Sequence, residues 1–172
     1  MPRLQSVSAV IGGILLSMTL ASASASRTTE KLTKDVKSGD GVSDQRVMTS
    51  ITGQELNDIL VDAGFSAGKV DDDGDVLVKV EDKAFYFLIG RNRDSIEAKT
   101  AWRTTDASRP SIDRMNDWNR TKKYSKTYFD NERDPVLQLD LDLAGGVTVA
   151  RIKDFALTAR VSLKAFTSEV LK

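Results

Sequence analysis

The clearest structural signal in this chain lies in residues 114–149, which read RMNDWNRTKKYSKTYFDNERDPVLQLDLDLAGGVTV. Across Pro135–Leu143, apolar residues alternate with Val136, Gln138, Asp140 and Asp142. This period of two predicts a β-strand with one buried face and one face in water. The β-forming run Tyr124–Phe129 precedes it, and Asp130–Asp134 between the two runs has side chains typical of a tight turn. The pattern therefore predicts two neighbouring strands joined by a turn.

Helical patterns flank these two strands. Upstream, Ile112, Met115 and Trp118 lie on one face of a helix that Ser111 can cap. Downstream, a pair of glycines ends the strand, and Thr148 can cap a long last helix. Apolar residues recur along that last segment at helical spacing, which predicts one buried stripe.

The first half of the domain begins with another helix. Thr52 and Glu55 are spaced as a capping box, and the helix that they begin is predicted to end near Gly64. Four β-rich runs follow, the first of them weak: Phe65–Val70, Val76–Glu81, Ala84–Ile89 and Ser95–Thr104. The last three are separated by hairpin-length connections, which predict antiparallel neighbours. Residues 85–89 are apolar on both faces, so this run is predicted to be an interior strand, covered by helices on one side and by a partner or more chain on the other.

The predicted element order is helix, three or four strands, helix, two strands, helix. Because the connections are short, this order predicts an α+β domain in which an antiparallel β-sheet is packed with helices. The chain has 172 residues, a length that fits one such domain plus an extension.

The composition excludes several classes of function. The chain has no cysteine and no histidine, which removes disulfides, thiol chemistry, the commonest general base and the commonest transition-metal ligand. Lys and Arg together number 25, and Asp and Glu together also number 25. A balanced charge gives no electrostatic attraction to nucleic acid.

The N-terminal residues have the pattern of a secretory signal. Arg3 precedes the apolar run Val10–Leu20, which is too short for a membrane span, and small residues suitable for cleavage follow it. We predict a signal peptide over residues 1–25 with cleavage after Ala25, or else after Ala23. The mature protein is then exported, periplasmic or secreted, and does not span the membrane. Residues 26–50 are polar and predict a disordered linker, so the folded domain is expected over 51–172.

Four runs of the chain carry a family resemblance. They are MNDWNRTKKY at 115–124, TYFD at 127–130, DPVLQLDLDL at 134–143 and GGVT at 145–148. On these runs the chain resembles the YbjN family, described as bacterial sensory transduction regulators. The resemblance implies a fold like that of type III secretion chaperones, with the order α-β-β-β-α-β-β-α. It implies no catalytic, cofactor-binding or metal-binding residues, so no cofactor is expected.

Acidic side chains supply the weak candidates for a chemical site. Asp71, Asp73 and Asp75 are clustered hard oxygen ligands, but they lack the spacing and distal Glu of a calcium-binding loop, so a solvated turn is favoured. Asp140 and Asp142 lie on one strand face as a glycosidase pair would, although their alternation with leucines favours a solvent face. These groups keep one alternative open, a hydrolase that depends on carboxylates or a divalent metal.

The preferred function is a non-enzymatic protein-binding module of the cell envelope, regulatory or chaperone-like. It would use its sheet or an exposed strand edge to hold an unidentified protein partner. The candidate binding face is Phe85, Phe87, Trp118, Tyr128 and Leu139, although for Trp118 core packing is favoured. A homodimer is a further expectation, because a small sheet with two apolar faces needs cover on both.

Overall fold

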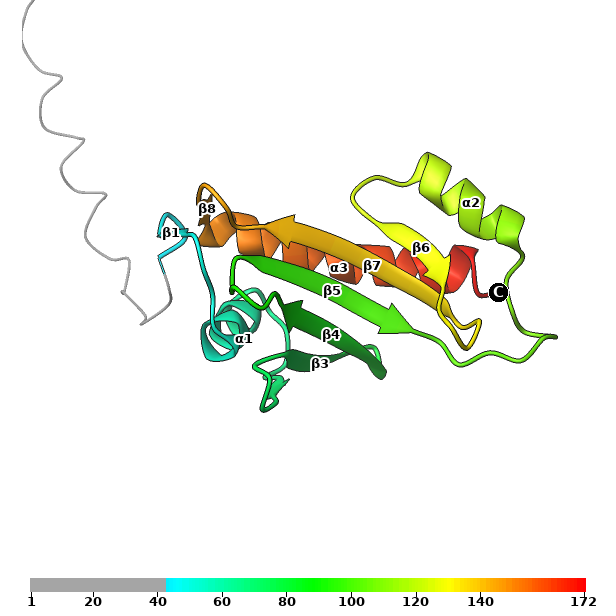
Figure 1. Ribbon diagram of the computed structural model, residues 1–172, viewed down its shortest axis with the longest axis horizontal. Helices are drawn as coiled ribbons and strands as arrows, with labels where there is room; N and C mark the ends of the chain where they lie inside the picture. The colour runs from blue at the N-terminus through cyan, green and yellow to red at the C-terminus, as the bar shows by residue number, and fades with distance from the viewer. Residues whose placement is uncertain (1–42) are drawn as a thin grey trace, which may run out of the picture. The chain divides into compact units, whose positions relative to one another are not determined.

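An antiparallel sheet of six strands is the framework of residues 43–172, the part of the chain that this computed structural model describes (Figure 1). The strand order is β2-β3-β4-β5-β7-β6. The strands are β2 (Lys69–Val70), β3 (Val76–Val80), β4 (Lys83–Ile89), β5 (Ser95–Ala101), β6 (Lys126–Phe129) and β7 (Pro135–Asp142). The helices are α1 (Gly53–Asp62), α2 (Ile112–Thr121) and α3 (Val149–Glu169). The predicted α+β class and the predicted order of helices and longer strands are confirmed.

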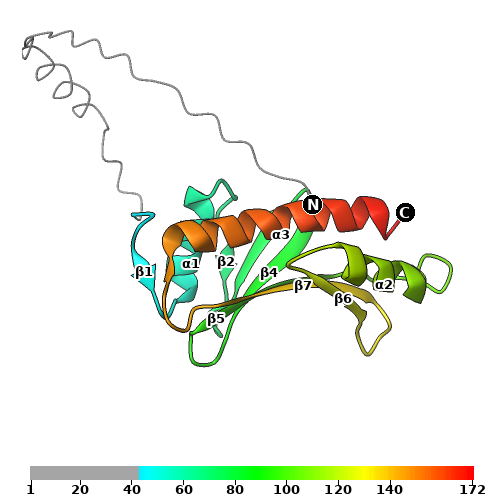
Figure 2. The ribbon, with the colours of Figure 1, turned by 90° about the horizontal axis from the view of Figure 1, so that it is seen from above.

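The helices leave one face of the sheet bare. α3 runs along one side of the sheet, and α1 lies on that side too, while the other face carries no helix of the described residues (Figure 2). Side chains from α1, α3 and the inner faces of β3, β4, β5 and β7 form one buried cluster. α2 packs against β6. Ile112, predicted on the buried face of α2, is 60% exposed, whereas Met115 and Trp118 are buried.

The interior position of β4 and its cover by helices on one face are confirmed, and its other face is not covered by any part of residues 43–172. β4 lies between β3 and β5, and Phe85 and Phe87 are fully buried beneath the helices. Tyr86 points to the bare face and is 41% exposed. Consecutive strand residues face opposite sides of a sheet, and only one side here has helices to cover it.

β7 departs from the predicted alternation in its first half. Asp140 and Asp142 are exposed as expected, but Val136 and Gln138 are 1% and 7% exposed. β7 pairs there with β5 on one side and β6 on the other. Side chains of these two neighbouring strands surround Gln138, so even the face without helices is buried at that point.

The folded part of the chain begins before Ile51, where the domain was predicted to start. Residues Val47–Met48 form β1, which pairs with β8 (Val147–Thr148), and Met48 is buried. The last residues of the predicted linker therefore belong to the fold. The rest of that linker and the predicted signal peptide lie outside the described residues.

The segment around β1 also holds the start of α3. Arg46 and Asp44 accept hydrogen bonds through their backbone oxygens from Val149 N and Ala150 N, at 2.9 and 3.0 Å. Hydrogen bonds to the carboxylates of Asp44 and Asp62 raise the pKa of Lys153 above its ordinary value. The start of α3 is thus held by backbone and side-chain contacts to the residues around β1, and by an ion pair to the last residue of α1.

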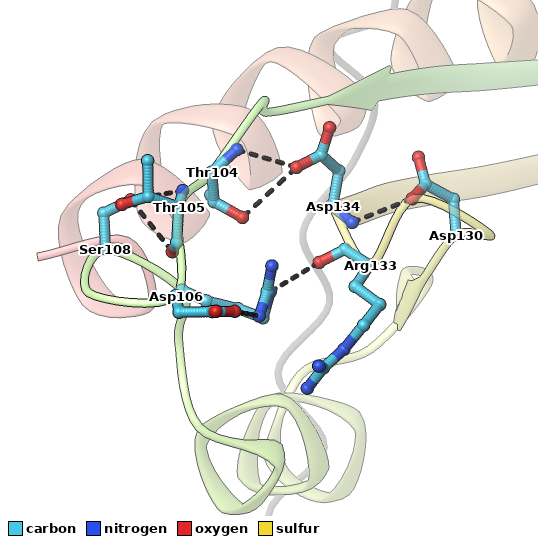
Figure 3. A network of polar contacts seen from close by, with 8 residues as sticks. Thr104, Thr105, Asp106, Ser108, Asp130, Arg133 and Asp134 are labelled. Carbon is cyan, nitrogen blue, oxygen red and sulfur yellow. Dashed lines mark hydrogen bonds and ion pairs between the residues drawn. The ribbon is translucent and has the colours of Figure 1, made fainter.

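The turn between β6 and β7 forms as its aspartates predict. Asp130 Oδ1 accepts a hydrogen bond from Asp134 N at 2.8 Å, which closes the turn (Figure 3). Asp134 Oδ1 in turn accepts from Thr104 N at 2.7 Å. Arg109 Nε donates to Arg133 O at 2.8 Å and also pairs with Asp106, and that contact lowers the pKa of the Asp106 carboxyl. This network ties the long β5–α2 connection to the turn.

Thr52→Ala is expected to lower the free energy of unfolding by about 1 kcal/mol. Thr52 Oγ1 accepts from Glu55 N at 3.3 Å, and Glu55 Oε2 accepts from Thr52 N at 3.0 Å, so the predicted capping box is present. Urea unfolding followed by circular dichroism measures the loss. Thr158→Ala in α3 is the matched control and should change stability by less, because alanine is a good helix former. Equal losses would show that the cap contributes nothing specific.

Candidate functional site

The outer edge of β7 is free over half its length. β6 pairs with Pro135–Gln138 only, and no strand of residues 43–172 pairs with that edge from Leu139 to Asp142. Figure 1 shows β6 beside one part of β7, with the remaining edge uncovered. A free edge presents backbone N–H and C=O groups that can pair with another extended chain.

The entry into β6 explains why pairing stops at Gln138. Tyr124 has φ +66°, a left-handed conformation that turns the chain away before it can extend β6 along β7. Trp118 Nε1 donates to Ser125 Oγ at 3.1 Å, and Asn119 exchanges two hydrogen bonds with the backbone of Thr127 at 2.9 and 2.8 Å. α2 thereby fixes the point at which the strand begins. Tyr124 itself is 76% exposed at the end of the free edge.

A hollow of about 540 Å³ lies between the free edge and α3, and we call it the β7 groove. Four residues of one α3 face line it: Arg151, Asp154, Phe155 and Thr158. Leu139, Asp140 and Tyr124 line the other side. Arg151 and Asp154 form an ion pair at 2.8 Å within this lining. The groove therefore offers polar groups from these residues and apolar groups from Phe155 and Leu139.

The opposite edge of the sheet, on β3, is partly covered. β2 pairs with only the first two residues of β3, and no strand of residues 43–172 pairs with that edge from Val78 to Val80. A Cβ atom on Gly68 would stand 2.8 Å from Leu77 O and 2.9 Å from Val78 Cγ1, so the backbone there is in direct contact with β3. Hollows of about 480 and 330 Å³ also lie beside β3, but the unpaired stretch of β7 is longer, four residues against three, so we take the edge of β7 as the candidate site.

The sheet face without helices, which we call the open face, carries a polar network around Gln138. Tyr128 Oη donates to Gln138 Oε1 at 2.7 Å, and Gln138 Nε2 donates to Glu97 and Asp140, each at 2.8 Å. Burial lowers the pKa of Lys99, but the Tyr128 hydroxyl and the Glu97 carboxylate outweigh that effect and leave the pKa above its ordinary value. The network therefore holds its charged members in fixed positions on an accessible surface.

The structure does not bring the predicted binding residues onto one surface. Phe85, Phe87 and Trp118 are buried in the core, at 0%, 0% and 3% exposure, so their assignment to a binding face is corrected. Their side chains lie on the helix side of the sheet and pack in the buried cluster with apolar side chains of the helices. Leu139 is buried as well, yet it lines the β7 groove. Tyr128 lies on the open face.

The acidic candidates are engaged locally. Asp71 Oδ1 accepts from the backbone of Asp73 and Asp75 at 3.1 and 2.9 Å, and Asp75 Oδ1 accepts from Ile89 N at 2.8 Å. Asp140 pairs with Lys126 at 3.0 Å, and Asp142 accepts from the backbone at 2.8 Å. Within residues 43–172 there is no group of three or more acidic side chains placed to hold a metal ion.

The residues that matter for the β7 groove escaped sequence reasoning. Arg151, Asp154 and Thr158 are spaced along one helix face, but so are the residues of any solvent-exposed helix surface. Their role depends on where β6 begins, which contacts from α2 determine. The left-handed backbone of Tyr124 could not be predicted from its residue type, because tyrosine rarely adopts this conformation.

Among helices of the described residues, none has the length and hydrophobicity required to cross a membrane.

Comparisons with known proteins agree on the fold. A family model, YbjN, with the description "Putative bacterial sensory transduction regulator", matches residues 52–172. The crystal structure of YbjN from E. coli is 14% identical, with a TM-score of 0.58, over 74% of this chain and 99% of that one. The Yersinia pestis type III secretion chaperone SycH, crystallised with a fragment of YscM2, is 10% identical, with a TM-score of 0.51, over 69% and 99%.

The ExsC–ExsE complex contains a third similar structure. It is 14% identical, with a TM-score of 0.50, over 69% of this chain and 92% of that one. At these identities the likeness concerns the fold alone. A comparison with curated protein sequences found no match.

Proposed function

This chain belongs to the YbjN family, and from that premise we infer that it is a non-enzymatic protein-binding module that takes an extended segment of a partner along β7. The observation that carries the inference is the free edge from Leu139 to Asp142 beside the β7 groove. A segment that pairs with this edge gains backbone hydrogen bonds, and its alternate side chains enter the hollow.

The groove suits a segment with apolar and polar residues in alternation. Phe155 and Leu139 offer apolar contact at its floor, while Arg151 and Thr158 offer hydrogen-bonding groups from α3. Strand pairing recognises the backbone, so a partner of varied sequence is admitted as long as its apolar residues recur at every second position. This mode of binding fits a regulatory or chaperone-like role.

Two similar structures support a role in binding protein. SycH was crystallised with a fragment of YscM2, and ExsC with ExsE. The fold of this chain is therefore one that carries a polypeptide partner in other proteins. No observation on residues 43–172 favours the alternative of a carboxylate- or metal-dependent hydrolase.

The site of action that we propose is the cell envelope. The support is the N-terminal pattern of a basic residue, an apolar run and small residues up to Ala25. An exported protein without cysteine needs no oxidative step to fold, and the large buried cluster is able to stabilise this domain without disulfides.

Site-specific photo-crosslinking tests the β7 groove directly. A benzophenone side chain at Thr158 or Tyr124, introduced in the native host, is expected to capture a partner polypeptide. The same group at Ile112, which is 60% exposed on α2, is the matched control and should capture nothing specific. Mass spectrometry of the crosslinked peptide then identifies the segment that was bound.

The identified segment, made as a synthetic peptide, allows a second measurement. Strand addition should slow hydrogen exchange of backbone amides within Leu139–Asp142, because pairing shields them from water. Crosslinks of equal yield from all three positions, or exchange protection confined to other strands, would refute binding in the groove.

A further inference from the structure

The open face carries its charges in two separate bands. The pairing register places Glu97 opposite Asp140, and Asp142 lies two residues further along β7 on the same face. All the charged side chains in the two adjacent rows of the sheet are basic: Lys69, Lys79, Lys99 and Lys126. One end of the face is therefore acidic and the middle of it basic.

Apolar side chains lie between and beside these charges on β3 and β4. Tyr86 stands in the same row as Leu77 and Lys99, and Leu88 stands in the row of Glu97. Tyr86 is 41% exposed, and both leucines are partly exposed. A face of this kind combines an apolar centre with charged surroundings, as specific protein interfaces do.

We propose that the open face binds a second copy of this chain, face to face, about a two-fold axis that runs across the strands. Rotation about such an axis reverses the strand direction and keeps each strand above its equivalent. The acidic band of one copy then lies over the basic band of the other, and the reverse contact forms by symmetry. An axis along the strands would instead place like charges together.

The strand register determines which residues face one another in this interface. With the axis between the two bands, Glu97 of one copy faces Lys99 of the other, and Leu88 faces Tyr86. Asp140 comes within reach of Lys126 on the neighbouring strand. Sheets packed face to face align within about 30°, which preserves these pairings near the axis.

Complementarity of both signs favours a second copy over an unrelated partner. Within each copy Lys99 lies 3.4 Å from Glu97, and Lys126 lies 3.0 Å from Asp140. These pairs at the border of the bands are partly exposed and contribute little alone. In the dimer each of the four groups gains a second counterion. Lys69, Lys79 and Asp142 form no ion pair within residues 43–172.

Charge reversal with complementation tests the proposal. Asp140→Lys and Lys126→Glu should each weaken self-association by about tenfold or more, because each places like charges together twice in a symmetric dimer. An equimolar mixture of the two variants should restore association to near the wild-type constant. Sedimentation velocity over a dilution series measures the association constants of the wild type, the two variants and their mixture. No partner peptide is present, so the outcome is independent of binding in the β7 groove.

The mixture separates a broken interface from a damaged fold. Each variant keeps its internal repulsion when mixed, so recovery arises only from contacts between copies. Asp72→Lys makes the same change of charge at an exposed turn and should leave the dimer constant unchanged. A wild-type chain that stays monomeric up to about 1 mM would overturn the proposal. So would variants that dimerise like the wild type, or a mixture without recovery.

Discussion

Phe87→Ala is expected to lower the free energy of unfolding by about 3–5 kcal/mol. Phe87 is fully buried, and its ring makes edge contacts with Phe65, Phe85 and Phe155 at centroid distances of 6.1, 5.4 and 6.5 Å. These rings come from the α1–β2 connection, β4 and α3, so the substitution opens a cavity where three parts of the core meet. Urea unfolding monitored by circular dichroism measures the loss.

Tyr86→Ala is the matched control for Phe87→Ala. The two residues are adjacent in β4 and similar in size, but Tyr86 lies on the open face and is 41% exposed. In dilute solution we expect its removal to cost about 1 kcal/mol or less, because exposed positions contribute little to stability. Similar losses for both variants would mean that the two faces of β4 are buried to a similar extent, contrary to the structure.

Phe166→Ala is expected to cost a similar amount, about 3–5 kcal/mol, at the other end of the core. Phe166 is fully buried in α3 between Trp118 of α2 and Trp102 after β5, with ring centroids at 5.3 and 4.9 Å. Its loss removes the aromatic contact between α2 and α3. Chemical unfolding gives the energy, and tryptophan fluorescence gives a local signal.

The fluorescence signal is informative because the chain has only two tryptophans and both contact Phe166. We expect a red shift of the native emission in Phe166→Ala, since the cavity admits water to the rings. Val161→Ala, on the exposed side of α3, is the control. It should change the free energy of unfolding by no more than about 0.5 kcal/mol and should leave the emission unchanged. An unshifted spectrum in a destabilised Phe166→Ala protein would contradict the aromatic contact.

Local patterns predicted most of the fold. The capping box at Thr52, the turn at Asp130–Asp134 and the apolar stripe of α3 each depend on residues close in sequence, and each has its expected conformation. The uninterrupted apolar run of residues 85–89 also identified β4 as an interior strand. The resemblance to the YbjN family, which rested on a few short runs, supplied the same order of elements and is confirmed by the match over residues 52–172.

The candidate site was harder to predict because it depends on what lies next to each strand. Alternation shows that Phe87 and Tyr86 face opposite sides, but it does not show which side the helices cover. The prediction therefore assigned Phe87 to a binding face and missed Tyr86. The free edge of β7 depends on where β6 starts, which contacts of Trp118 and Asn119 determine from outside the strand.

The pairing of β1 with β8 has a mechanical consequence. Tension that enters the described part of the chain at its first residues reaches the β1–β8 ladder, and the hydrogen bonds from Val149 and Ala150, before it reaches the sheet. If the other end of the load is the C-terminal end of α3, the force passes along this helix, which runs along the sheet (Figure 2). A chain pulled at both ends would therefore be loaded first at the β1–β8 ladder and at the start of its longest helix, and not at the free edge of β7.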